Sequence, residues 1–181
     1  MDRRRALELL GTLAIAPALT PNDLLQLGER VHASIGAPRA LTAAQLRTVT
    51  AAAERIIPRT DTPGATDAGV ADFVDVMLAD WYSAPERERF IGGITQLDGR
   101  AERVHGKAFA DCAVADQLAL LGDADADVAH SRGTAATQHW FAMLKYLTVW
   151  GFCTSRVVAA LEPQMTGRYD GNAPYKAANP S

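Results

Sequence analysis

Three aspartates alternate between residues 123 and 127, as the first ligands of an EF-hand calcium loop do. Such a loop also needs a glycine for its sharp turn and a glutamate that binds the ion through both oxygens, where this sequence has Val128 and Thr134. Both the turn and the set of oxygen ligands are therefore incomplete. We interpret residues 123–133 as a polar, solvated loop rather than a calcium site.

The histidines and serines lack the neighbours that would give them metal-binding or catalytic roles. No two histidines have the H-x-x-x-H spacing that puts two ligands on one helix face. Ser34 and Ser155 lack the glycine-flanked turn that exposes a serine nucleophile. Carboxylate pairs such as Asp72 with Asp75 fall where exposed helix positions are expected. The sequence therefore predicts no catalytic residue and no metal site.

The sequence also lacks the motifs that bind redox cofactors. It contains neither G-x-G-x-x-G nor G-x-x-x-x-G-K-[ST], so no dinucleotide or phosphate loop is indicated. It has no C-x-x-C-H haem attachment motif, and its two cysteines are too few to ligate an iron–sulfur cluster. We expect no flavin, haem or metal bound by this chain alone.

Composition places the chain among ordinary globular proteins. Its 181 residues fit one domain, and 48% hydrophobic with 22% charged residues give enough apolar surface for a core. The formal net charge of −3 gives no reason to expect nucleic-acid binding. Protein partners or small molecules are the better expectation.

Residues 1–20 resemble an export signal, with a basic start, a short apolar stretch and a small-residue cleavage site at 16–18. The pattern resembles a twin-arginine signal. Its residues are Arg3, Arg4, Arg5 and Leu7. The apolar stretch is shorter than the roughly 20 residues that cross a bilayer, so membrane association is expected only through the signal or through partners. The alternative is an amphipathic N-terminal helix that stays on the domain or on a partner.

Residues 54–81 predict two helices joined by a tight turn. Pro58 should end the first helix at Ile57, because proline lacks a backbone N–H and disfavours helical geometry in the residue before it. Pro63 and Gly64 predict a turn over residues 62–65, with a positive φ at Gly64. Apolar residues at helical spacing then predict a core helix from Val70 to Trp81.

Helical spacing and capping residues predict the remaining elements as well. Helices are expected near residues 20–35, 42–57, 83–106, 113–121, 137–150 and 155–161, with a break at 151–155. Gly92 and Gly93 inside one helix indicate a close helix crossing or a kink. No stretch alternates as a strand does. We predict an all-α fold: a signal segment (1–20), a single compact helical bundle (21–162) and an extended C-terminal tail (163–181).

Several segments resemble, in order, the gluconate 2-dehydrogenase subunit 3 family. They are R-I-I-P-R-T-D-T-P-G-A-T-D-A-G-V-A-D-F-V-D, G-K-A-F-A-D-C, H-W-F-A-M-L-K-Y-L-T-V-W-G-F-C-T-S and M-T-G-R-Y-D-G-N-A-P-Y. The chain departs from the family pattern at residues 152–153, where tyrosines are common, at Arg156, where an acid is common, and at Asn172, where a cysteine is expected.

The resemblance implies a non-catalytic small subunit of an oxidoreductase complex that acts on CH–OH groups of sugars or polyols. The large subunit of such complexes resembles glucose-methanol-choline oxidoreductases and binds FAD, and a cytochrome c subunit often accepts the electrons. The small subunit implied is a chaperone whose signal carries the folded flavoprotein into the periplasm. The alternatives are a free-standing helical binding module and an independent enzyme.

A partner interface and a disulfide complete the predictions. The expected interface residues are Trp81, Trp150, Arg168, Tyr169 and Asp170. A tail that folds back on its own bundle is the alternative for the last three. Cys112 and Cys153 form either a disulfide, worth about 4 kcal/mol in the chain-entropy model, or two buried thiols. A twin-arginine substrate folds in a reducing cytoplasm, so the fold should not depend on that bond.

Overall fold

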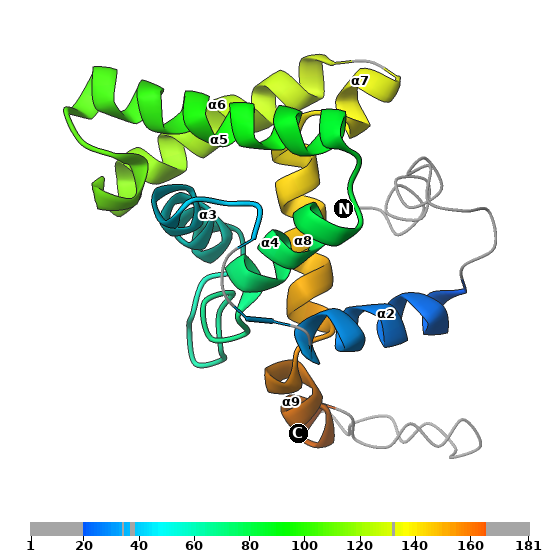
Figure 1. Cartoon of the computed structure of the whole chain (residues 1–181). Helices are drawn as coiled ribbons and strands as arrows, with labels where there is room; N and C mark the ends of the chain where they lie inside the picture. Colours follow the sequence, from blue (N-terminus) through cyan, green and yellow to red (C-terminus); the bar gives the residue numbers. More distant parts are fainter. Residues whose placement is uncertain (1–19, 34, 37–38, 132, 166–181) are drawn as a thin grey trace, which may run out of the picture.

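The computed structural model describes residues 20–33, 35–36, 39–131 and 133–165, and every regular element in these ranges is helical (Figure 1). The predicted all-α fold is confirmed. The elements are α2 (Pro21–Ala33), α3 (Ala43–Ile56), α4 (Val70–Asp80), α5 (Ala84–His105), the 3-10 helix η1 (Phe109–Asp111), α6 (Val114–His130), α7 (Thr134–Thr137), α8 (Trp140–Cys153) and α9 (Arg156–Met165). Most of the predicted signal segment and all of residues 166–181 lie outside the described residues.

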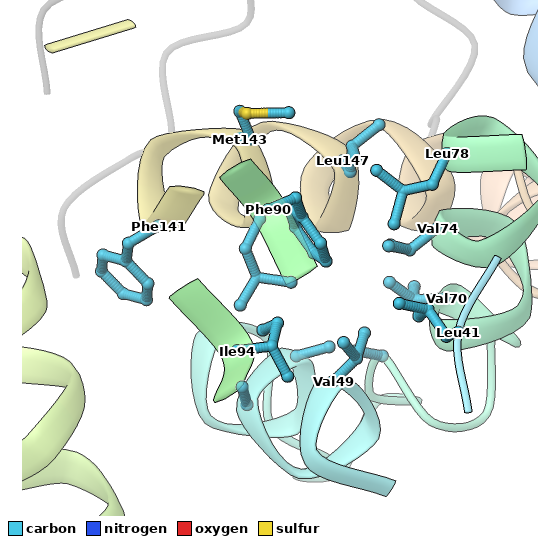
Figure 2. Packing of buried hydrophobic residues seen from close by; sticks show 14 of the residues in the cluster. Leu41, Val49, Val70, Val74, Leu78, Phe90, Ile94, Phe141, Met143 and Leu147 are labelled. Carbon is cyan, nitrogen blue, oxygen red and sulfur yellow. The ribbon is translucent and has the colours of Figure 1, made fainter. Parts of the chain in front are cut away.

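Helix α8 is the centre of the bundle, and α4 and α5 make the most extensive contacts with it. Figure 1 shows α5 and α6 side by side across one end of α8, with α3 on one flank and α2 crossing near the other end. The core lies where α3, α4, α5 and α8 converge (Figure 2). Its largest fully buried apolar side chains are Phe73, Met77, Leu78, Phe90, Ile94, Phe109, Leu144 and Leu147. Each contributes about 1.5–3 kcal/mol gross when removed from water.

The predicted helix starts and stops are confirmed where they depend on local chemistry. Thr42 and Gln45 form a reciprocal capping box, in which the Gln45 Oε1 accepts from the Thr42 N–H at 2.9 Å. Glu86 accepts from the Ser83 N–H at 3.0 Å in the same way. Helix α3 ends at Ile56, with Ile57 as its C-cap before Pro58. Local hydrogen bonds therefore define these boundaries.

The predicted loop over residues 123–133 is wrong, because α6 continues through Gly122 to His130. Leu121 and Ala124 are buried and Val128 is half-buried, so this part of the chain has an apolar face that the core covers. On the exposed side Asp123 pairs with Arg100 at 2.5 Å. Burial of this face outweighs the cost of one helical glycine, about 1 kcal/mol.

The predicted break at residues 151–155 is also wrong in part, because α8 continues to Cys153. A Cβ on Gly151 would lie 2.7 Å from the Phe73 ring, so this glycine permits close packing of α4 on α8 rather than ending the helix. The predicted extended tail begins at residue 163, yet α9 includes Pro163 and runs to Met165. The first residues of the predicted tail are therefore helical.

Candidate partner-binding surface

The loop between α3 and α4 is held by the carboxylate of Glu54, at the end of α3. Glu54 accepts hydrogen bonds from the Arg59 N–H at 2.8 Å, the Thr66 N–H at 2.9 Å and the Thr66 hydroxyl at 2.6 Å. Burial raises the pKa of Glu54, but the bonds from Thr66 and Arg59 together outweigh it and lower the pKa below its ordinary value. One side chain thus ties both ends of the loop to α3.

A second carboxylate, Asp67, braces the same loop from within. It accepts from the Gly64 N–H at 2.9 Å and pairs with the Arg59 guanidinium. The expected positive φ at Gly64 is not observed: among the described glycines, positive φ occurs at Gly69, Gly106 and Gly133. Gly64 is needed for a different reason, since a Cβ there would lie 2.5 Å from the Arg59 nitrogen. The loop is therefore tightly folded.

Beside this loop lies an open groove of about 600 Å³ between α3, η1 and the start of α6; we call it the α3–α6 groove. Its lining residues are Ala43, Leu46, Arg47, Thr50, Ala51, Glu54, Arg55, Thr66, Ala110, Cys112, Val114 and Gln117. Val114 is 54% exposed, and Leu118, one turn further along α6, is 51% exposed. The groove thus continues into an exposed apolar edge.

The charged groups of the groove are not all paired. Arg47, which lines the groove, pairs with Asp111 of η1 at 2.6 Å. Arg55 lies beside Glu54 and lowers its pKa, but both Glu54 oxygens already accept bonds from the loop. The buried Arg55 Nε has no hydrogen-bond partner among the described residues. Because Nε is buried, a ligand in the groove can reach Arg55 only through the part of the side chain that lines the groove.

The predicted interface residues are placed differently from one another. Trp81, the C-cap of α4, is 51% exposed, and its contact with a partner stays a prediction. Trp150 is only 8% exposed, donates its indole N–H to the Leu24 carbonyl at 3.1 Å and packs edge-on against Phe73. Little of its surface is left for a partner. The remaining predicted interface and signal residues lie outside the described residues: Arg168, Tyr169, Asp170, Arg3, Arg4, Arg5 and Leu7.

The two cysteines have different surroundings. Cys112 is buried under η1, where its thiol lies 3.4 Å from the Ala108 carbonyl oxygen. Cys153 is exposed at the end of α8. Both are free thiols in the structure. A disulfide between them stays a prediction.

The α3–α6 groove was missed from the sequence, although part of its signal is present. Val114 and Leu118 are four residues apart and border the buried face of α6, which carries Gln117, Leu121 and Ala124. Apolar residues that widen the buried face of a helix at its edge are such a signal. Nothing in the sequence shows that Arg55 lacks a partner, because that depends on which segments meet around it.

Within the described residues, no group of three or more histidine, cysteine, aspartate or glutamate side chains could hold a metal ion. No helix described by the structure has both the length and the apolar character needed to cross a membrane.

The described residues thus form an all-helical body with a braced loop and an open groove. Residues 43–170 match the family model described as gluconate 2-dehydrogenase subunit 3, and the chain belongs to this family. The family name implies that the chain is an accessory subunit of a dehydrogenase complex. Comparison with curated proteins and with solved structures gives no significant match.

Proposed function

We propose that the chain is the non-catalytic small subunit of a periplasmic FAD-dependent sugar or polyol dehydrogenase, needed for export, maturation and stability of its flavoprotein subunit. The observation that carries the proposal is the family match, which spans the helical body from α3 to beyond α9. The flavoprotein supplies FAD and the chemistry, and a cytochrome c subunit is the candidate electron acceptor.

Two features of the chain, its packed helical body and its N-terminal segment, support this proposal. The braced α3–α4 loop and the packed core give a rigid body, which binds a partner at a small cost in conformational entropy. The twin-arginine-like segment around Arg3 and Arg4 would then carry the assembled complex across the inner membrane. Stabilisation follows from mass action, because a subunit that binds only the folded flavoprotein favours the folded state.

The test is co-expression of the chain with a candidate FAD-binding large subunit from the same organism. We expect yellow, FAD-containing material to accumulate in the periplasm only when the chain is present. The matched control is the double variant Arg3→Lys, Arg4→Lys, which should leave the complex intact but keep it in the cytoplasm. Export of active flavoprotein without the chain, or sugar oxidation by the isolated chain, would contradict the proposal.

A further inference from the structure

We infer that the α3–α6 groove binds a segment of the flavoprotein subunit that carries apolar side chains and a carboxylate, with the carboxylate paired to Arg55. This inference rests on the proposed function and adds the surface through which the subunits meet. It follows from three properties of the groove: its apolar edge, the Arg55 cation that lines it and its fixed shape.

The apolar edge comes from α6. Among the described residues, the large hydrophobic side chains that are at least about half exposed are Leu25, Trp81, Val104, Val114, Leu118 and Val149. Val114 and Leu118 lie one turn apart on one face of α6, and Val114 lines the groove together with the half-buried Leu46 and Ala51. Covering these residues with apolar side chains of a partner removes them from water.

The Arg55 guanidinium specifies the charge of the ligand. Arg55 lines the groove and is half-buried, and a carboxylate is the group that a guanidinium binds most strongly, through two parallel hydrogen bonds. Arg47 is paired with Asp111, and the Glu54 carboxylate, whose charge also acts on Arg55, already accepts hydrogen bonds from the loop. An acidic side chain flanked by apolar ones therefore complements this surface, and a basic segment does not.

The fixed shape comes from polar anchors under the groove. Gln117 donates its side-chain N–H to the Phe109 carbonyl at 2.9 Å, which ties η1 to α6. Asp98 of α5 accepts from the Phe109 N–H at 3.0 Å and from the Thr48 hydroxyl at 2.8 Å, which ties η1 and α3 to α5. The groove walls are thus set before a ligand arrives, and binding does not have to order them.

The experiment compares groove variants with matched variants elsewhere, in the full chain and with the purified flavoprotein. Leu118→Asp and Arg55→Glu alter the groove. Leu25→Asp, at a leucine 49% exposed on α2, and Arg89→Glu, at an exposed position on α5, are the controls. We expect the groove variants to raise the dissociation constant at least tenfold and the controls to change it less than threefold. Circular dichroism and thermal unfolding verify that each variant is folded.

A photo-crosslinking residue at Val114 provides a second readout that does not depend on loss of binding. We expect it to link to the flavoprotein, at a segment that contains an aspartate or a glutamate. Wild-type affinity in both groove variants, or a crosslink to a second copy of this chain or to residues 166–181, would overturn the inference. Such results leave the proposed function standing if the wild-type chain still binds the flavoprotein. Failure of the wild-type chain to bind would remove both.

Discussion

Trp140 lies directly against Gly93, so closely that a Cβ on that glycine would be 2.0 Å from the indole Cγ. The sequence predicted a close crossing or a kink at Gly92 and Gly93, and the structure shows a crossing of α5 with the start of α8. The close approach occurs at Gly93 and not at Gly92, because a Cβ on Gly92 would meet nothing within 4 Å.

These adjacent glycines give a paired prediction for stability. Gly93→Ala should lower the free energy of unfolding by about 1–3 kcal/mol, because the atoms in the way are the root of the Trp140 side chain and cannot swing aside. Gly92→Ala should raise it by about 0.5–1 kcal/mol through helix propensity alone. Urea unfolding measures both. Equal effects of the two variants would show that α5 and α8 do not cross as described.

Asp75 carries the second prediction. The sequence placed this carboxylate on an exposed helix face, but it is 3% exposed and accepts hydrogen bonds from three successive backbone N–H groups. The donors are Arg39 at 2.7 Å, Ala40 at 2.9 Å and Leu41 at 2.7 Å. Asp75→Ala leaves these N–H donors without an acceptor and should lower the free energy of unfolding by about 3 kcal/mol. Asp72→Ala, one turn earlier and half-exposed, is the control and should cost less than about 1 kcal/mol in the same denaturation experiment.

The comparison of Asp75 with Thr42 shows what the sequence could and could not predict. Thr42 bonds to a residue three positions away, so its cap is readable from the local sequence alone. Asp75 bonds to a segment more than thirty residues earlier, and α6 continues past Gly122 only because other helices cover its apolar face. The α3–α6 groove likewise joins segments separated by α4 and α5. The local sequence was enough to predict the helices. The burial of Asp75 and the grouping of residues in the groove depend on how the helices are arranged, which the local sequence does not show.

The α3–α4 loop should open when Glu54 is replaced. In Glu54→Ala the amides of Arg59 and Thr66 lose their acceptor, so hydrogen exchange at these amides should accelerate at least tenfold at pH 7 while exchange in α8 changes little.

The pKa of Glu54 is lowered in the folded state. The stability that it contributes is therefore present above the unfolded-state pKa, near 4.5, and is lost as the pH falls through the folded-state pKa. The difference in unfolding free energy between the wild type and the variant should shrink accordingly below pH 4.5. A difference that stays constant down to pH 3 would contradict this assignment.

Helix α2 should dock less firmly in mild acid, because His32 is held neutral against α8. Its Nε2 donates to the Gly151 carbonyl at 2.7 Å, and its ring lies 5.0 Å from the Phe73 ring. Burial lowers the pKa of His32 below 6.5, more than the bond to Gly151 raises it. Between the folded-state pKa and 6.5 the unfolded chain thus binds more protons than the folded chain, and the free energy of unfolding falls as the pH drops through this window.

His32→Gln retains a donor for Gly151 but cannot titrate, so its unfolding free energy should decline less than that of the wild type between pH 7.5 and pH 5.5. Part of the decline should persist, because burial also lowers the pKa of His139. Urea midpoints at the two pH values measure the difference, and identical declines in both proteins would exclude His32 as its source.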